Sequence, residues 1–300
     1  VDASTEPTIK RALEIAAAGG HNVIMIGSPG SGKTMLARRI PTILPPMTLD
    51  EALETTKIHS VAGKIGAHRG LITSRPFRAP HHLTSQVALI GGGQYPQPGE
   101  VSLANNGVLF LDEMPEFGRN VLEVLRQPLE DRHITISRAR YSVDYPANFM
   151  LIASMNPCPC GYYGSSIKEC ICKPEQIKRY INKISGPMLD RIDLHIEVES
   201  VKYEKFNSNE QSETSEQVRY RVNQARKIQI DRYKEYGILS NSELTPKLID
   251  KYCTLNLQSK KLLENAFERL GLSVRAYNKI LKVARTIADL EDSKNIELPH

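Results

Sequence analysis

The sequence predicts an α/β fold with a parallel sheet core, followed by a small all-helical domain. Three short apolar runs, at residues 23–26, 108–111 and 149–153, have the length and composition of buried parallel strands. Helix-forming stretches alternate with such runs, as in an α/β sheet. Beyond about residue 216 only helical periodicity continues.

The composition is that of an ordinary folded chain. Hydrophobic residues make up 40% of the 300 residues, which excludes a disordered or fibrous protein. The net charge of +5 is compatible with an acidic partner such as DNA but does not require one. No apolar run reaches the length of about 18 residues that a membrane helix needs, and the first twenty residues lack a secretory pattern. We therefore expect a cytoplasmic protein without a membrane span.

The N-terminal helices and strand are predicted from the residues at their ends. Residues 6–18 carry a proline in the first turn and are followed by a glycine pair, which is typical of a helix. The strand at 23–26 comes next, and residues 33–40 form the following predicted helix.

A hairpin is predicted between Ile134 and Asn148. Two partly alternating stretches flank a polar, basic middle at 137–140. This arrangement would place Arg138 and Arg140 at the tip.

A polar segment at 203–216 predicts a domain boundary. The α/β domain would comprise residues 1–202 and the helical domain residues 203–300. Helices of the second domain are predicted near 216–236, 246–252, 259–270 and 273–292.

The segment after the first strand is predicted to bind phosphate. It matches the pattern G-x-x-x-x-G-K-[ST] between a strand and a helix, the context that the pattern requires. Backbone N–H groups would turn toward the phosphates of ATP, Lys33 would reach the β and γ phosphates, and Thr34 would ligate Mg²⁺. The alternative is a glycine loop that only turns the chain. The predicted nucleotide-binding residues are Gly27, Ser28, Pro29, Gly30, Ser31, Gly32, Lys33 and Thr34.

Polar residues follow the other two strands. Asp112 and Glu113 end the run VLFL, and two carboxylates at a strand end are costly unless a cation or water meets them. We expect Asp112 to hold Mg²⁺ and Glu113 to polarise the attacking water. Asn156 follows the third strand and is placed to orient that water or to touch the γ phosphate, although such a residue alone is more often a turn former.

Four of the five cysteines form a C-x-C-x9-C-x-C cluster after the third strand. Cys158, Cys160, Cys170 and Cys172 could build a closed, tetrahedral, structural Zn²⁺ site. Free thiols or an oxidised pair are the alternatives. Cys253 is predicted to be a small core residue.

Six segments together resemble one protein family. The segments are GSPGSGKTMLARRIPTILPPMT, RPFRAPHH, NNGVLFLDEMPEF, IASMNPCPCGYYG, ISGPMLDRIDLHIEV and LSVRAYNKILKVARTIADL. They resemble the AAA+ ATPases, and within them the branch of the magnesium chelatase ATPase subunit I and the ComM (YifB) competence protein family. The paired histidines, the CPCG cluster and the LDRIDLH stretch are more similar to the ComM group.

The resemblance implies roles for three residues. Arg191 resembles an arginine finger that reaches the γ phosphate bound by a neighbouring subunit. From the residues alone, an ion pair of Arg191 with Asp190 or Asp193 is the alternative. Arg275 resembles the sensor-2 arginine of a lid domain, and Asn156 resembles sensor 1.

The resemblance also implies two insertions. One lies between about 47 and 97, before the strand at 108–111, which resembles the Walker B strand, and the other is the hairpin before sensor 1. In related rings such insertions point into the pore, so Arg138 and Arg140 are candidate contacts to a DNA backbone. A solvated hairpin tip is the alternative. No role is assigned to His81 and His82.

The resemblance implies an ATP-hydrolysing ring, a hexamer, with Mg²⁺ as cofactor. A ComM-like protein would be a DNA helicase or translocase that promotes branch migration in natural transformation and recombination. The alternatives are the ATPase motor of a magnesium chelatase-like metal insertion complex and a protein-remodelling ATPase. The last would need an aromatic-hydrophobic pore loop, and the sequence shows no convincing one.

Overall fold

The computed structural model describes residues 7–65, 70–138, 141–166, 168–199 and 213–300. The chain divides into two compact units. One unit, called the first unit below, contains residues 22–41 and 46–208. The second unit contains residues 1–21, 42–45 and 209–300. None of the described helices combines the length and the apolar composition needed to cross a bilayer.

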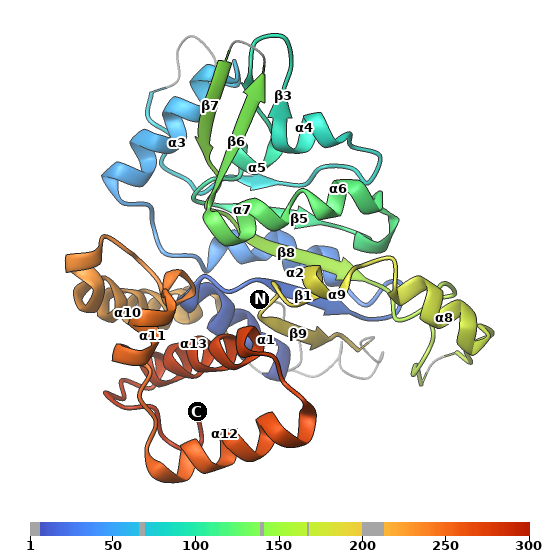
Figure 1. The fold of residues 1–300 in the computed structure, drawn as a ribbon, viewed down its shortest axis with the longest axis vertical. Helices are drawn as coiled ribbons and strands as arrows, with labels where there is room; N and C mark the ends of the chain where they lie inside the picture. Colours follow the sequence, from blue (N-terminus) through green and yellow to red (C-terminus); the bar gives the residue numbers. More distant parts are fainter. Residues whose placement is uncertain (1–6, 66–69, 139–140, 167, 200–212) are drawn as a thin grey trace. The chain divides into compact units, whose positions relative to one another are not determined.

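A five-stranded sheet forms the centre of the first unit, and all its strand pairs are parallel (Figure 1). The sequence prediction of a parallel α/β sheet is therefore confirmed. The middle strands are almost entirely apolar and buried, as expected where both faces of a sheet are covered. In sheet order, the strands are β2 (Phe77–Arg78), β5 (Val108–Leu111), β8 (Met150–Met155), β1 (Val23–Ile26) and β9 (Leu194–Glu197).

The register of the sheet brings three strand ends together. Ile26 of β1 pairs with Met155 of β8, and Leu111 of β5 pairs with Ala153 of β8. Because the strands are parallel, the residues that follow them meet at one edge of the sheet. That edge carries the glycine-rich loop, the acidic pair and Asn156.

The helices of this unit are short, and their apolar residues join those of the sheet in one core that includes Ile24, Leu109 and Met188. The longest, α3 (Leu49–Val61), begins with a capping box between Thr48 and Glu51. The remaining helices are η1 (Ile40–Thr42, 3₁₀), α2 (Lys33–Arg39), α4 (Gln86–Ile90), α5 (Glu100–Leu103), η2 (Met114–Glu116, 3₁₀), α6 (Arg119–Glu123), α7 (Arg126–Asp131), α8 (Pro174–Ile181) and α9 (Gly186–Leu189).

The hairpin is present, and it consists of β6 (His133–Arg138) and β7 (Tyr141–Pro146). In Figure 1 it projects from the sheet beside β3 (Gly91–Gly92), which pairs with β4 (Gln97–Pro98). The Tyr145 hydroxyl donates a hydrogen bond to the carbonyl of Pro96, at 3.0 Å, and so ties the hairpin to the insertion before the Walker B strand. Arg138 ends β6, whereas Arg140 lies outside the described residues.

The second unit is helical. Its four C-terminal α-helices lie where the sequence predicts them, and three of them begin at a capping residue, namely Thr214, Asn256 and Ser273. Helix α1 (Pro7–Gly19) also packs here, although its place in the sequence predicts that it belongs to the first domain. The elements are α1 (Pro7–Gly19), α10 (Ser215–Tyr233), η4 (Lys234–Tyr236), η5 (Asn241–Glu243), α11 (Pro246–Tyr252), α12 (Leu257–Leu270) and α13 (Val274–Leu290).

A buried ion network joins the helices of this unit. The Asp289 carboxylate is fully buried and accepts hydrogen bonds from the Arg232 guanidinium at 2.5 and 3.0 Å. Arg285, also buried, lies 3.1 Å from the same carboxylate, and Asn241 donates to it at 2.9 Å. One carboxylate thus compensates two arginines of α10 and α13.

Cys253 lies in the core of the helical unit, next to the end of α11, and is 4% exposed. Burial raises the pKa of its thiol to about 11. The prediction of a small core residue is confirmed.

Candidate nucleotide site and four-cysteine loop

The glycine-rich loop has the backbone shape of a phosphate cradle. Gly30 and Gly32 have φ angles of 77° and 87°, in the left-handed region that favours glycine. Gly32 directly precedes α2 and makes no side-chain cap, so the first N–H groups of the helix remain available to a ligand. Two left-handed glycines followed by a helix N-terminus are the backbone features expected of a phosphate-binding loop.

Lys33 is 8% exposed and lies inside this loop. Its Nζ donates hydrogen bonds to the carbonyls of Gly27 and Ser28, at 2.8 and 2.9 Å, and to Oδ1 of Asn156 at 3.3 Å. Desolvation lowers the pKa of Lys33, while the charges of Asp112 and Glu113 oppose that shift. The ammonium group is thus positioned by the loop and lies in the field of both acids.

The side chains of Thr34 and Asp112 contact each other. The Thr34 hydroxyl donates a hydrogen bond to Oδ2 of Asp112 at 2.9 Å. The buried hydroxyl of Ser154, in β8, donates to the other carboxylate oxygen. A hydroxyl beside a carboxylate matches the preference of Mg²⁺ for hard oxygen ligands, so these residues fit the ion. Sequence reasoning missed Ser154, whose signal is a small polar residue inside an otherwise apolar strand.

Glu113 is exposed and has an unusual backbone conformation. Its φ angle is 52°, which is uncommon for a residue other than glycine and clusters at functional sites. Its N–H donates to the Ser154 hydroxyl at 3.2 Å. Glu113 is the residue directly before η2, and its side chain is accessible to solvent.

Arg191 is buried beside α7. Its Nη2 donates to Glu130 and its Nη1 to the carbonyl of Pro187, both at 2.5 Å, while its Nε has no hydrogen-bond partner among the described residues. The ion-pair partner is therefore Glu130 and not Asp190 or Asp193. Asp193 instead accepts the N–H of Asn22 at 3.0 Å.

Arg275 belongs to the helical unit, where it is exposed in the first turn of α13 after the capping residue Ser273. Its predicted action on the nucleotide therefore stays a prediction. Within the α/β unit the structure brings together Lys33, Thr34, Asp112, Glu113 and Asn156.

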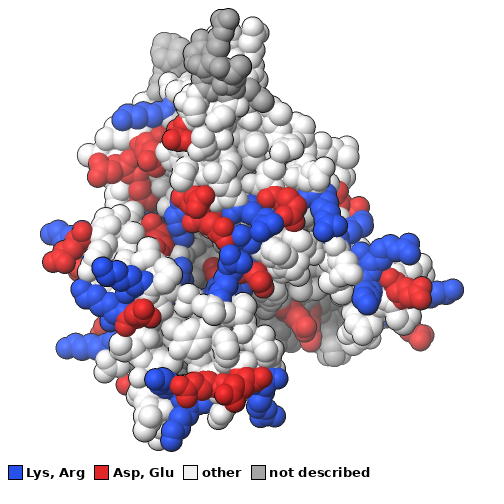
Figure 2. Space-filling view, in the orientation of Figure 1, with Lys and Arg blue, Asp and Glu red and all other residues white. Residues whose placement is uncertain are grey.

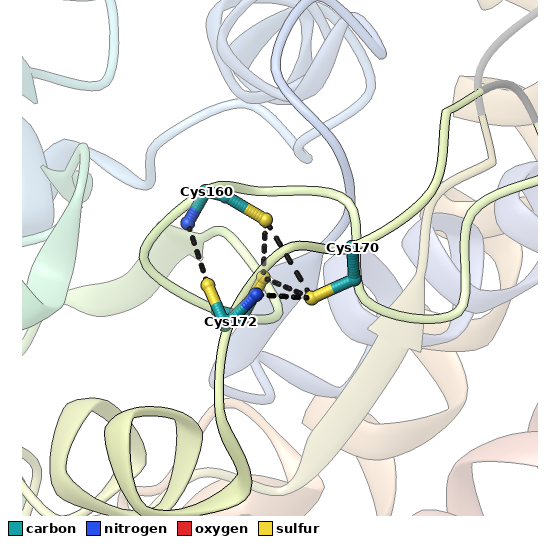
Figure 3. A group of neighbouring side chains, drawn as sticks. Cys160, Cys170 and Cys172 are labelled. Atoms are coloured by element: carbon teal, nitrogen blue, oxygen red, sulfur yellow. Dashed lines mark hydrogen bonds between the residues drawn. The ribbon is translucent and has the colours of Figure 1, made fainter.

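The four cysteines after β8 converge, and their sulfur atoms all lie within 4.8 Å of one another. The sulfur of Cys160 lies 3.4 Å from that of Cys158 and 3.6 Å from that of Cys170. Figure 3 shows the labelled side chains directed toward one another. None of the four forms a disulfide. Four thiols at this separation fit a tetrahedral Zn²⁺ ion, which takes sulfur ligands in closed structural sites.

Two of these thiols differ in acidity. Hydrogen bonding by the Tyr162 backbone lowers the pKa of Cys160 to about 6. The Cys172 backbone acts to lower the pKa of Cys170, but desolvation and the neighbouring thiols outweigh it and raise the value to about 12. Because a metal binds the thiolate form, metal affinity should rise with pH as the Cys170 proton becomes easier to displace.

The fold and this site define a P-loop nucleotide-binding module of the AAA+ class of ATPases. The chain belongs to the magnesium chelatase subunit ChlI family. Residues 2–206 match the family described as "Magnesium chelatase, subunit ChlI", and residues 212–300 match its C-terminal part.

The most similar relatives include bacterial proteins that align with nearly the whole chain. The "Competence protein ComM" of Haemophilus influenzae is 51% identical over 293 residues, which are 97% of this chain and 56% of that protein. The "Uncharacterized protein YifB" of Salmonella typhimurium is 47% identical over the same shares of both chains. A chloroplastic "Magnesium-chelatase subunit ChlI" of Oryza sativa is 26% identical over 45% of this chain and 38% of its own length. The chain spans about half the length of the bacterial relatives.

We expect the purified, reduced protein to contain about one equivalent of zinc per chain, and the variant Cys158→Ser to lose it, because removing one of four ligands opens a closed site. Elemental analysis by mass spectrometry checks this. The control is Cys253→Ala, which removes a thiol outside the cluster and should leave the zinc content unchanged. A folded wild-type protein that contains no zinc and exposes four titratable thiols would contradict the expectation.

Proposed function

We propose that this chain is the ATP-hydrolysing module of a ring-shaped motor that acts on DNA. The observation that carries the ATPase part is the convergence of a buried lysine, a hydroxyl–carboxylate pair, an exposed acid and an amide at one edge of the parallel sheet. Ligands bind at this edge in open α/β sheets.

Each of these residues has a role in the in-line attack of water on the γ phosphate. The loop amides and Lys33 bind the phosphates, and Thr34 and Asp112 hold Mg²⁺, which offsets the phosphate charge when bound. Glu113 polarises the attacking water, and Asn156 orients it. Ser154 fixes the direction of the Asp112 carboxylate through its hydrogen bond.

We further propose that the subunits form a hexameric ring and that Arg191 acts on the nucleotide of a neighbouring subunit. Rings are typical of the AAA+ class to which the chain belongs. For this role Arg191 must leave Glu130 and contact the γ phosphate that is bound by the neighbouring subunit. Arg275 would act from the helical lid.

DNA is the proposed substrate of the motor. The support is the 51% identity to a protein named for competence and the two arginines, Arg138 and Arg140, that the sequence predicts at the hairpin tip. On the face shown in Figure 2, Lys and Arg are interspersed with Asp and Glu, so the proposal rests on the hairpin and not on a broad basic field. On this proposal the motor promotes branch migration during natural transformation and recombination.

We expect single-stranded or forked DNA to stimulate ATP hydrolysis of the intact protein several-fold, and the double variant Arg138→Ala, Arg140→Ala to lose most of that stimulation. The reason is that each arginine that contacts a phosphate adds favourable electrostatic free energy, which appears as a salt-dependent affinity. The measurement is phosphate release with and without DNA at two salt concentrations.

The matched control for this experiment is Lys260→Ala, Lys261→Ala, which removes the same charge from the exposed face of α12. It should retain stimulation. Hydrolysis that is indifferent to every DNA, in protein shown by sedimentation to form rings, would sink the DNA proposal.

A second candidate is the motor subunit of a magnesium chelatase-like complex. The observation that favours it is that both parts of the chain match the ChlI family. DNA-independent hydrolysis in assembled rings is the result that would favour this function.

A further inference from the structure

The four-cysteine loop packs directly on the phosphate loop. A Cβ atom added at Gly161 would lie 2.5 Å from Cδ and 2.7 Å from Cγ of Pro29, and 3.8 Å from Cγ of Asn156. Such short separations do not occur between real side chains, so Gly161 is in close contact with the Pro29 ring. Pro29 is the third residue of the phosphate-binding pattern.

The cysteine cluster fixes the position of Gly161. This glycine follows Cys160, has a φ angle of 87°, and donates its N–H to the carbonyl of Cys158 at 3.0 Å. Cys158 is fully buried, and its sulfur also accepts the N–H of Tyr163 at 3.3 Å. Gly161 therefore belongs to the turn that contains Cys158 and Cys160, and its position depends on theirs.

The same segment reaches the phosphate loop at a second point. Asn156 lies two residues before Cys158 and accepts a hydrogen bond from Nζ of Lys33 at 3.3 Å. The chain from Asn156 to Gly161 thus contacts the loop at Pro29 and at Lys33.

We propose that the four-cysteine loop, closed by a Zn²⁺ ion, braces the phosphate loop, so that occupancy of the metal site controls nucleotide affinity. The proposal rests on the proposed function, because it assumes that the phosphate loop binds ATP. A loop of little core of its own has a large choice of conformations, and four metal bonds restrict them. Without the ion, Gly161 and Asn156 lose their fixed positions, and the binding conformation of the phosphate loop becomes less populated. The apparent affinity for ATP then falls in proportion to that population.

Two glycines of the cysteine loop offer a matched pair of variants. Gly161 and Gly164 both have left-handed φ angles, 87° and 74°, so alanine strains the backbone at either position. At Gly164 an added Cβ would have nothing within 4 Å, whereas at Gly161 it would overlap the Pro29 ring. The difference between the two variants isolates the contact between the loops.

The test measures the dissociation constant of a fluorescent ATP analogue, mant-ATP, for the intact, zinc-loaded protein. We expect Gly161→Ala to weaken binding about tenfold or more, and Gly164→Ala to change it by less than about twofold, with zinc content unchanged in both. Pro29→Ala removes the Cγ and Cδ atoms that would overlap, so the double variant Gly161→Ala, Pro29→Ala should recover affinity relative to Gly161→Ala. Recovery would show that the lost affinity of Gly161→Ala comes from the overlap with the Pro29 ring.

The second part of the test removes the metal. Removing zinc from the wild-type protein with a chelator should weaken mant-ATP binding and speed hydrogen exchange in residues 27–34, and added zinc should reverse both. Wild-type protein that fails to bind mant-ATP at all would overturn the proposed ATPase function. If wild-type protein binds mant-ATP but the two glycine variants have equal affinity, the proposal that the cysteine loop braces the phosphate loop is overturned. The same holds if zinc removal leaves the affinity of the wild-type protein unchanged.

Discussion

The variant Glu113→Gln is expected to hydrolyse ATP about 10²- to 10⁴-fold more slowly than the wild-type protein, because a neutral amide cannot polarise the attacking water as a carboxylate does. Nucleotide affinity should stay close to that of the wild type, since Glu113 follows β5 and does not belong to the phosphate loop. Phosphate release at saturating ATP and mant-ATP titration measure the two quantities separately.

The control for this variant is Glu116→Gln, which removes a carboxylate from the short helix η2 that directly follows Glu113. Glu116 pairs with Lys183 at 3.1 Å, and both side chains are about half exposed. Because exposed ion pairs contribute little, loss of this pair should hardly change the rate of ATP hydrolysis. Glu113→Gln protein that hydrolyses ATP at the wild-type rate would show that another group activates the water.

The variant Asp289→Asn is expected to destabilise the helical unit by about 3–5 kcal/mol, because it leaves buried arginines without their counter-charge. The Asp289 side chain is fully buried and that of Arg285 is 3% exposed, so water cannot screen the charge that remains. Asparagine has the same size as aspartate, so the change in packing is small. Urea unfolding followed by circular dichroism checks the loss.

Asp231→Asn provides the control, because Asp231 is an exposed aspartate of α10. Its replacement should change the free energy of unfolding by less than about 0.5 kcal/mol. If Asp289→Asn changed the stability equally little, the network around Asp289 would contribute no net stabilisation.

The central sheet and its functional edge could be predicted because each carries a local signal. Buried parallel strands are short apolar runs, and the residues directly after β1, β5 and β8 are the polar ones. Parallel pairing then brings these residues together wherever they lie in the sequence. The phosphate loop, Asp112, Glu113 and Asn156 follow from that rule.

Features that depend on long-range contacts could not be predicted. Nothing near Arg191 in the sequence indicates Glu130, which lies 61 positions away. Helix α1 has an ordinary helical pattern that does not reveal its packing partners α10 and α13. The contact of Gly161 with Pro29 has no sequence signal either, because a glycine in a loop fits many turns.

The insertion between 47 and 97 shows a different limit. Apart from helix α3, which has 13 residues, its elements are short: the strands β2, β3 and β4 have two residues each, and α4 has five. Elements of that length are too short to display a period of 2 or 3.6 residues. Tertiary contacts such as the ion pair of Arg78 with Glu100, at 2.6 Å, hold such segments in place.

The pair of Arg191 with Glu130 lies at the base of the β6–β7 hairpin, since α7 ends at Asp131 and β6 begins at His133. Six residue pairs join the two strands, and Arg132 closes the base by donating to Asn148 at 2.6 Å. Two paired strands of this length extend about 20 Å, so a rotation at their base moves their far end much farther than it moves the base. On the proposed role of Arg191, a small displacement of α7 would therefore become a larger displacement at the far end of the paired strands.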